Sequence, residues 1–281
     1  MGVIFGLLAA LGWGAGDFVL SRIARRIGPL PTLLYVQVAG IAAICLVLVL
    51  RRDPLPADPE LWTLAAGVNL LNVAGTLCLY RALAVGTVAI VSPIAASFAA
   101  VTAVLAFIGG ERLEPLALAG VALVMGGVVV VSRPPAELPA GAAGQTTGIA
   151  AALGAAFAYG VFFYLLGPVT AGMGIAWPVL VGRLLTTAVA LALLALRRVV
   201  PPRPNRELLG AAALATSLDT MGFLSYNSGI ATAYVSVVTA LASIFSAVTV
   251  LLAWVVLRER LAASQWAGVA AVLAGVLLVS V

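Results

Sequence analysis

Long apolar segments alternate with short polar gaps along almost the whole chain of 281 residues. Each segment is close to the roughly 20 residues that a helix needs to cross the hydrocarbon core of a bilayer. In lipid such a segment must be helical, because each backbone polar group needs a partner within the segment. The pattern predicts an all-α polytopic membrane protein. Its ten expected transmembrane helices lie at about 2–21, 31–50, 61–81, 88–109, 115–132, 147–167, 175–196, 207–229, 234–257 and 263–281.

The two halves of the chain repeat each other at a nearly constant offset. Residues 111–113 and 259–261 both read Glu-Arg-Leu, at an offset of 148, and Gln37 corresponds to Arg183 at an offset of 146. Five segments that match in order are not expected by chance, so we expect an internal duplication. The expected units are a first five-helix repeat at 1–132, a Pro/Gly-rich linker at 133–146 and a second five-helix repeat at 147–281.

An odd number of spans in each half fixes how the halves sit in the membrane. The second half must enter from the opposite side, which makes the two units inverted repeats. Many secondary carriers use this arrangement for alternating access, with the substrate site near the membrane midplane between the halves. We therefore predict a transporter of small solutes.

Composition excludes several other classes of protein. Hydrophobic residues make up 63% of the chain and charged residues 9%, which leaves no room for a soluble domain. All basic residues are arginines, mostly in the gaps between apolar segments, so they indicate membrane-surface charge and no nucleic-acid partner. Histidine is absent and the two cysteines lie in apolar segments, so we expect no disulfide, metal site or cofactor. The first segment lacks a basic leader and a cleavage site, and we interpret it as a retained span.

Several short motifs point to a known family. They are Leu11-Gly12-Trp13-Gly14, Ser92-Pro93-Ile94, Gly110-Glu111-Arg112-Leu113 and the second copy Leu257-Arg258-Glu259-Arg260-Leu261. Together they resemble the EamA-type repeats of the drug/metabolite transporter superfamily over essentially the whole chain. The resemblance implies a monomeric ten-helix carrier with a central cavity and both termini in the cytoplasm. It also implies transport of amino acids, nucleotide derivatives, sugars or drugs, often outward. The chain departs from the family at Thr239-Ala240, where a proline is common, and at Asp17.

Polar groups near the middle of two corresponding helices are the first candidates for a solute site. Asp219 lies about 12 residues into its segment, close to the expected midplane, and its counterpart in the first half is Asn72. Spacing places Asn69 on the same helical face as Asn72, and Tyr226 on the same face as Asp219. Ionisable groups inside a membrane are costly and therefore indicate function, although a structural polar contact is the alternative.

Arg183 is the second candidate, because an arginine inside an apolar segment needs a partner. One reading is a permanent ion pair with Asp219, with Gln37 opposite. The other is that the pair opens to hold the carboxylate and ammonium of a zwitterion, or that substrate or a proton competes for Asp219. Both readings require the same residues.

Helix 1 adds an acid and an aromatic residue. Trp13 and Asp17 lie one turn apart, as do their counterparts Tyr159 and Phe163, which suggests an aromatic lining suited to amphipathic or cationic solutes. Packed aromatic residues are the alternative. Arg22 or Arg81 could neutralise Asp17 near the membrane surface. Proton coupling through Asp17 or Asp219 and simple facilitated transport are both compatible with the sequence.

Two rival functions are weighed against transport. Gly14-Ala15-Gly16-Asp17 fits the Gly-x-Gly-Asp pattern of intramembrane aspartyl proteases, with Asp219 as the second acid. The order of the two motifs and the missing Pro-Ala-Leu motif argue against this enzyme, and we predict no catalytic residues. A membrane scaffold or receptor is the other rival.

Orientation is left open by two opposing arguments. Most arginines follow odd-numbered helices, which by the positive-inside rule places both termini outside the cytoplasm. The family resemblance implies the reverse. Either way the expected location is the cell membrane, with the lipid bilayer, a small solute and protons as the expected partners.

Overall fold

The computed structural model describes residues 1–85, 94–95, 97–131, 148–257 and 263–280, and helices are the only regular elements in these ranges. The predicted all-α class is confirmed. Several predicted features lie outside the described residues: the linker at 133–146, Ser92 and Pro93 of the helix 4 motif, and the second Glu-Arg-Leu at 259–261.

The helices follow the predicted order along the chain. They are α1 (Gly2–Ile27), α2 (Pro29–Arg51), α3 (Pro59–Val85), α5 (Phe98–Ile108), α6 (Pro115–Val131), α7 (Ile149–Met173), α8 (Trp177–Leu196), α9 (Arg206–Ile230), α10 (Val235–Ala242), α11 (Phe245–Leu257) and α12 (Ala263–Ser280).

Two helices extend furthest past their predicted ends. α1 continues through its arginines to Ile27, because long arginine side chains reach water while the backbone remains helical. α7 continues through Pro168 to Met173, although that proline lacks an N–H for the helix. Gly28 and Gly174 then end α1 and α7 with φ of 84° and 78°, a conformation that favours glycine.

The predicted ninth helix is the clearest error of the sequence analysis. The pattern predicts one helix at 234–257, whereas the structure breaks it into α10 and α11 at Ser243 and Ile244. The Ser243 hydroxyl donates to the carbonyl of Ala240 at 2.7 Å, and Ile244 N–H donates to Leu241 three residues back. Side-chain hydroxyls that bond to nearby carbonyls compete with the helical pattern, and they interrupt the helix without a proline.

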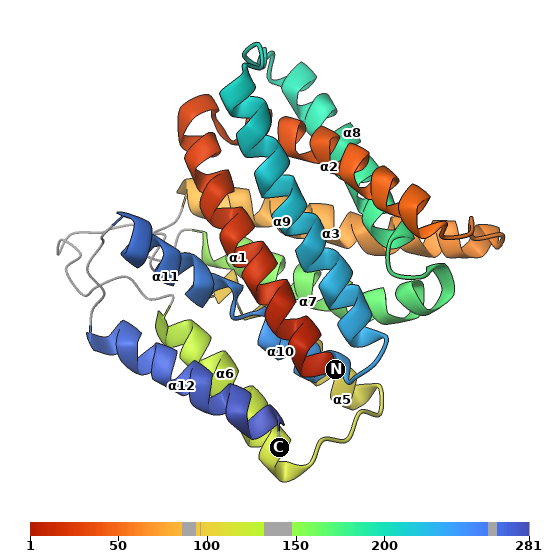
Figure 1. Cartoon of the computed structure of the whole chain (residues 1–281). Coiled ribbons are helices and arrows are strands. Elements are labelled where there is room, and N and C mark those ends of the chain that lie inside the picture. Colours follow the sequence, from red (N-terminus) through yellow and green to blue (C-terminus); the bar gives the residue numbers. More distant parts are fainter. Residues whose placement is uncertain (86–93, 96, 132–147, 258–262, 281) are drawn as a thin grey trace.

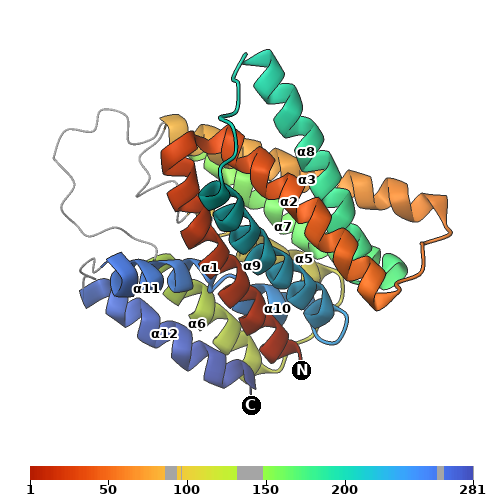
Figure 2. The ribbon, with the colours of Figure 1, turned by 45° about the horizontal axis from the view of Figure 1, so that its top comes forward.

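Helices pair across the two halves of the chain (Figure 1). α1 lies against α9, α3 against α7, α2 against α8 and α6 against α12. Figure 2 shows the α6/α12 pair at one side of the bundle and the α2/α8 pair at the other, with both termini at the same end. Half of the largest fully buried side chains among the described residues belong to one core cluster, which includes Phe162 and Leu166 of α7 and Tyr226 of α9.

Glycines allow the closest of these contacts. A Cβ added at Gly127 would lie 2.8 Å from the backbone nitrogen of Val272, and one at Gly275 would lie 2.7 Å from that of Val124. Likewise, a Cβ at Gly12 would lie 2.7 Å from the carbonyl oxygen of Leu218. Small residues let helix backbones approach one another in lipid, so these glycines set the spacing of α6/α12 and α1/α9.

Six described helices are long and apolar enough to cross a membrane, namely α1, α2, α3, α7, α8 and α9. The other predicted spans are represented by shorter apolar helices: α5, α6, α12, and α10 together with α11. These shorter helices border the ranges that are not described. The described part of the chain is thus consistent with a polytopic membrane protein.

Candidate functional site

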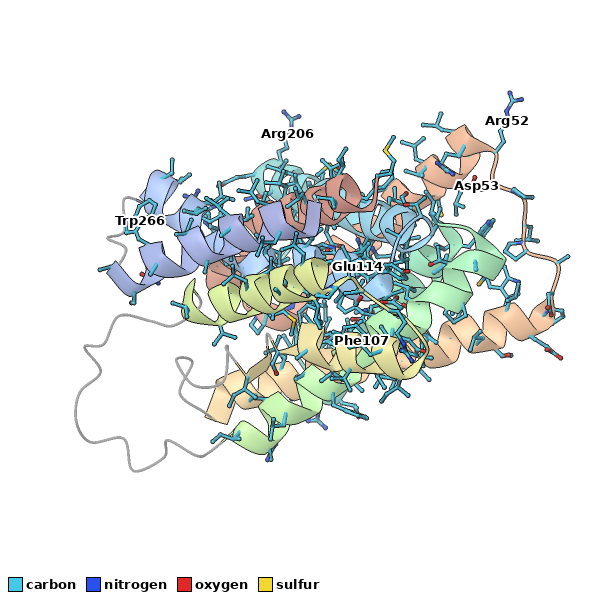
Figure 3. All side chains as sticks on the ribbon, turned by 90° about the horizontal axis from the view of Figure 1, so that it is seen from below. Arg52, Asp53, Phe107, Glu114, Arg206 and Trp266 are labelled. Carbon is cyan, nitrogen blue, oxygen red and sulfur yellow. The ribbon has the colours of Figure 1, made fainter. Side chains whose placement is uncertain are left out.

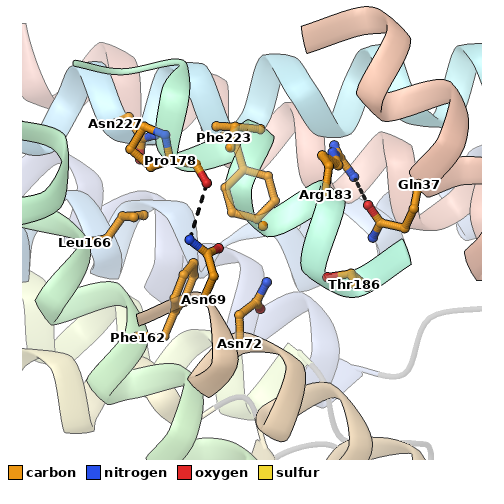
Figure 4. Close-up of a pocket in the computed structure, with 12 residues that line it drawn as sticks. Gln37, Asn69, Asn72, Phe162, Leu166, Pro178, Arg183, Thr186, Phe223 and Asn227 are labelled. Atoms are coloured by element: carbon orange, nitrogen blue, oxygen red, sulfur yellow. Dashed lines mark hydrogen bonds between the residues drawn. The ribbon is translucent and has the colours of Figure 1, made fainter. Parts of the chain in front are cut away.

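A polar pocket lies between α2, α3, α7, α8 and α9, about 350 Å³ in volume up to its open mouth (Figure 4). Four predicted site residues line it: Gln37, Asn69, Asn72 and Arg183. Side chains of Phe162, Leu166 and Phe223 supply apolar walls. The pocket is narrow inside and holds only water-sized molecules in this conformation.

Arg183 is the buried charge of the site, with 5% of its side chain exposed. It projects from the second turn of α8, and Gly40 on α2 makes room for it, since a Cβ there would lie 2.8 Å from Arg183 Nε. Nη1 donates to Gln37 Oε1 at 3.0 Å, and Nη2 donates to Thr220 Oγ1 at 3.2 Å. Its guanidinium carbon also lies 5.9 Å from the centre of the Phe223 ring, a cation–π contact.

Asp219 neutralises this charge from α9. Its Oδ2 accepts a hydrogen bond from Arg183 Nη2, so the predicted ion pair is present. Asp219 itself is 28% exposed and is not among the residues that line the pocket. The wall of the pocket is therefore close to net neutral. The guanidinium donates to α2 and α9 through Nη1 and Nη2, whereas its buried Nε has no hydrogen-bond partner within the described residues.

Asp17 reaches the same cluster from α1. Gly16, the residue before Asp17, lies against α9 at this level, since a Cβ added to it would lie 3.5 Å from the backbone nitrogen of Asp219. The expectation that Arg22 or Arg81 neutralises Asp17 is wrong for the described residues, in which neither forms an ion pair with it. Arg22 instead lies over the ring of Phe18 at 5.8 Å.

Side-chain amides supply most of the remaining polar lining. Asn69 Nδ2 donates to the carbonyl of Ala65 at 2.9 Å and to that of Pro178 at 3.3 Å. Asn227 Nδ2 donates to the carbonyl of Ile175 at 2.8 Å, whereas its buried Oδ1 accepts no hydrogen bond within the described part of the chain. An unpartnered buried acceptor in a pocket wall is suited to a donor on a bound solute.

The aromatic candidates are packed together beside this pocket and do not line it. Trp13 is 7% exposed, and its ring contacts Phe163 at 5.6 Å, Phe223 at 5.1 Å and Tyr226 at 5.6 Å between centroids. In this conformation Trp13 and Phe163 belong to the hydrophobic core. A role for them in solute binding stays a prediction.

Both candidate tyrosines are held by hydroxyl groups of neighbouring helices. Tyr226 OH lies 2.7 Å from Thr239 Oγ1 and 3.3 Å from the carbonyl of Phe163. Tyr159 OH lies 3.0 Å from Thr76 Oγ1. The tyrosines therefore brace helix contacts around the site.

Sequence reasoning missed three polar members of the site. Asn227, Thr186 and Thr220 lie on the same helices as the predicted residues, and each contributes to the pocket or to the arginine's bonds. Asn227 follows Asp219 by eight residues on α9. The recurrence of polar residues along that side of the helix could have identified Asn227 as a site residue.

Comparison with known families identifies the chain. The model of the EamA-like transporter family matches residues 1–133 and 146–281. The chain belongs to the EamA-like transporter family. This EamA-like chain is therefore a multi-pass membrane protein of a transporter family, with a small-molecule solute as the expected cargo.

One protein is similar to this EamA-like chain in sequence over half of its length, and one solved structure is similar to it in fold. An uncharacterized protein of Methanocaldococcus jannaschii is 31% identical over 132 residues, which cover 46% of this chain and 95% of that protein. A solved structure described as "Crystal structure of protein" superposes with a TM-score of 0.83 at 19% identity, over 99% of this chain and 94% of the other. At that identity the structural likeness shows the fold alone.

Proposed function

We propose that this EamA-like protein is a secondary transporter that moves a small zwitterionic or polar neutral solute by alternating access through the pocket at Arg183. The observation that carries the proposal is a buried, neutralised arginine in a pocket of amides and aromatic rings. Ionisable groups at such positions are typical of solute pathways. A near-neutral wall disfavours a solute with a large net charge, because its charge would be buried without compensation.

Inverted repeats are the second part of the proposal, with units at 1–132 and 147–281. Reciprocal contacts support it. Thr102 Oγ1 lies 3.0 Å from the carbonyl of Gly160, and Thr249 Oγ1, 147 residues later, lies 3.0 Å from the carbonyl of Gly14. Each threonine therefore holds the first helix of the opposite half.

Backbone conformations repeat in the same way. Arg52 and Arg198 are the non-glycine residues with positive φ in the described ranges, at 54° and 52°, and they lie 146 residues apart. Gly28 and Gly174 are separated by the same number. The M. jannaschii relative is about as long as one half, which fits an origin by duplication.

The ion pair provides a mechanism for coupling solute binding to movement. Arg183 and Gln37 connect α8 to α2, and Asp219 connects α8 to α9. A solute carboxylate that replaces Asp219 at the guanidinium would leave Thr220 as the hydrogen bond of Arg183 to α9 and so weaken the link between α8 and α9. A donor group of the solute would satisfy Asn227 Oδ1. Because the pocket is narrow, entry requires the helices to separate, which is the movement that alternating access demands.

Two finer expectations stay predictions. Export as the direction of transport rests on the family resemblance. Proton coupling rests on Asp17 and Asp219, two acids within membrane-spanning helices, where ionisable groups are costly and typical of proton pathways. A pH gradient that drives flux in the wild type and fails to do so in Asp17→Asn would support coupling.

The protease alternative gains no support. Asp219 is bound to Arg183, whereas an acid pair requires two carboxylates that share a proton with each other.

Flux into proteoliposomes tests the proposed function. The panel contains neutral amino acids, nucleosides and amphipathic cations, and the variants are Arg183→Gln and the control Arg51→Gln, which changes an exposed arginine at the end of α2. We expect flux of one solute class, reduced at least tenfold by Arg183→Gln and unchanged by Arg51→Gln. Flux that both variants leave intact would remove Arg183 from the pathway, and absence of flux across a broad panel would favour the scaffold or receptor reading.

A further inference from the structure

A second concavity lies at one end of the bundle, remote from the polar pocket. It runs between the C-terminal half of α1 and the N-terminal half of α9, beneath the loop that joins α8 to α9. Its volume is about 1110 Å³ up to the open mouth. The mouth carries Arg22, Arg26 and Arg203, and the floor is apolar, with Phe18, Ile23 and Leu214 among its residues.

Charge in this groove is unbalanced. Arg26 forms an exposed ion pair with Glu207, the one acid that lines the groove. Among the described residues, no carboxylate pairs with Arg22 or Arg203. The lining therefore carries a net charge of +2, from three arginines less one glutamate.

The groove also has the polarity profile of a membrane boundary. Leu214 lies eight residues after Arg206, the first residue of α9, which is about 12 Å along the helix. The same eight-residue distance separates Arg26 from Phe18 on α1. The arginines of the groove thus lie toward the end of the bundle and its apolar residues extend toward the middle, which is the order expected where headgroups give way to acyl chains.

The loop that roofs the groove is held in place. It contains the run Pro201-Pro202-Arg203-Pro204, in which three residues have fixed φ angles. The hydroxyl of Tyr35 on α2 donates to the carbonyl of Pro202, and Asn205 caps α9 by accepting from Leu208 N–H at 2.8 Å. Arg203 is therefore presented at the mouth by a restrained backbone.

We infer that this groove binds an anionic phospholipid, with the phosphate between Arg22 and Arg203 and an acyl chain along the floor of α1 and α9. Arginine recognises phosphate by paired hydrogen bonds and charge. Basic pockets between transmembrane helices at a membrane surface are typical sites for such headgroups. Because α9 also carries Asp219, a lipid that bridges α1 and α9 at this end would stabilise the helix pair beside the transport pocket.

Native mass spectrometry of the full chain in detergent tests the inference. Phosphatidylglycerol is titrated against phosphatidylcholine, and the variants are the double substitution Arg22→Gln/Arg203→Gln and the control Arg206→Gln. Arg206 lies at the same end but projects away from the helices, outside the groove (Figure 3). We expect at least a tenfold loss of phosphatidylglycerol affinity in the double variant and less than a twofold change in the control.

A variant that should bind the lipid more tightly distinguishes loss of the binding site from misfolding. Glu207→Gln removes the one acid of the groove, and each added unit of net positive charge near a membrane surface contributes about 1 kcal/mol, so phosphatidylglycerol should bind about fivefold more tightly. Equal affinity for both lipids in the wild type, or unchanged phosphatidylglycerol affinity in both groove variants, would overturn the inference. Inorganic phosphate that competes fully with the lipid at micromolar concentration would also overturn it, because the site would then recognise a free anion.

Discussion

Arg183 places a full positive charge among apolar helices, and neighbouring polar residues stabilise that charge by accepting hydrogen bonds from it. Gln37, Thr220 and Asp219 bind the guanidinium, and Gly40 leaves room for it. The pairing with Asp219 and the position of Gln37 could be predicted, because deep ionisable residues are few and must find partners. The part played by Asn227 could not, since a single amide in a helix does not reveal which neighbour it faces.

Removing one member of the ion pair should be worse than removing both. Asp219→Asn leaves the Arg183 guanidinium buried without a counter-charge, and Arg183→Gln leaves the partly exposed acid unpaired. We expect both single variants to lower the melting temperature in detergent. The double variant should recover much of the loss, with a coupling of about 1–3 kcal/mol.

Chemical unfolding of the wild type, the two single variants and the double variant measures that coupling. Strictly additive losses would show that Arg183 and Asp219 do not stabilise each other.

At the level of helices, the order of the helices and the break between α10 and α11 have different physical origins. The apolar runs predicted the order of the helices because burial in lipid dictates them. The break between α10 and α11 was not predictable in the same way, because it depends on the hydroxyl of Ser243 and on packing at both sides. Glu111 adds a contact across 124 residues of sequence: its carboxylate accepts from Val235 N–H at 2.7 Å and from Ser236 N–H at 3.2 Å, at the start of α10.

The contact of Glu111 should stabilise the broken helix. Glu111→Ala removes the acceptor of the first N–H groups of α10, and we expect a loss of about 1–2 kcal/mol, comparable to that of a helix cap. Glu114→Ala, an exposed acid in the same loop, should change stability by less than about 0.5 kcal/mol. Equal effects of the two substitutions on the melting temperature would argue against a specific role for Glu111.

Glycine spacing can be tested on a single helix. Gly126 and Gly127 are adjacent on α6, but a Cβ at Gly126 meets no atom of another element within 4 Å, whereas one at Gly127 would press on the backbone of α12. Gly127→Ala should therefore separate α6 from α12 and destabilise the protein by about 1–3 kcal/mol. Gly126→Ala should be neutral or slightly stabilising, because alanine favours the helix. Equal melting temperatures for the two variants would contradict close packing at Gly127.

At the scale of the whole molecule, the two halves interlock. α1 lies on α9 and α7 on α3, while α2 pairs with α8 and α6 with α12. Internal sequence matches predicted the duplication, but they could not predict these pairings, which depend on how helices of the two halves pack. The polar pocket lies among helices of both halves, so relative movement of the halves would change access to it.

Counterflow in proteoliposomes tests transport through this pocket most directly. Vesicles are loaded with an unlabelled solute that the panel identifies, diluted, and supplied with a trace of the same solute in labelled form. We predict transient accumulation of label above equilibrium in the wild type, because a carrier exchanges solute across its two access states, and its loss in Arg183→Gln. Labelled solute that only equilibrates in the wild type, or that accumulates equally in the variant, would contradict alternating access at Arg183.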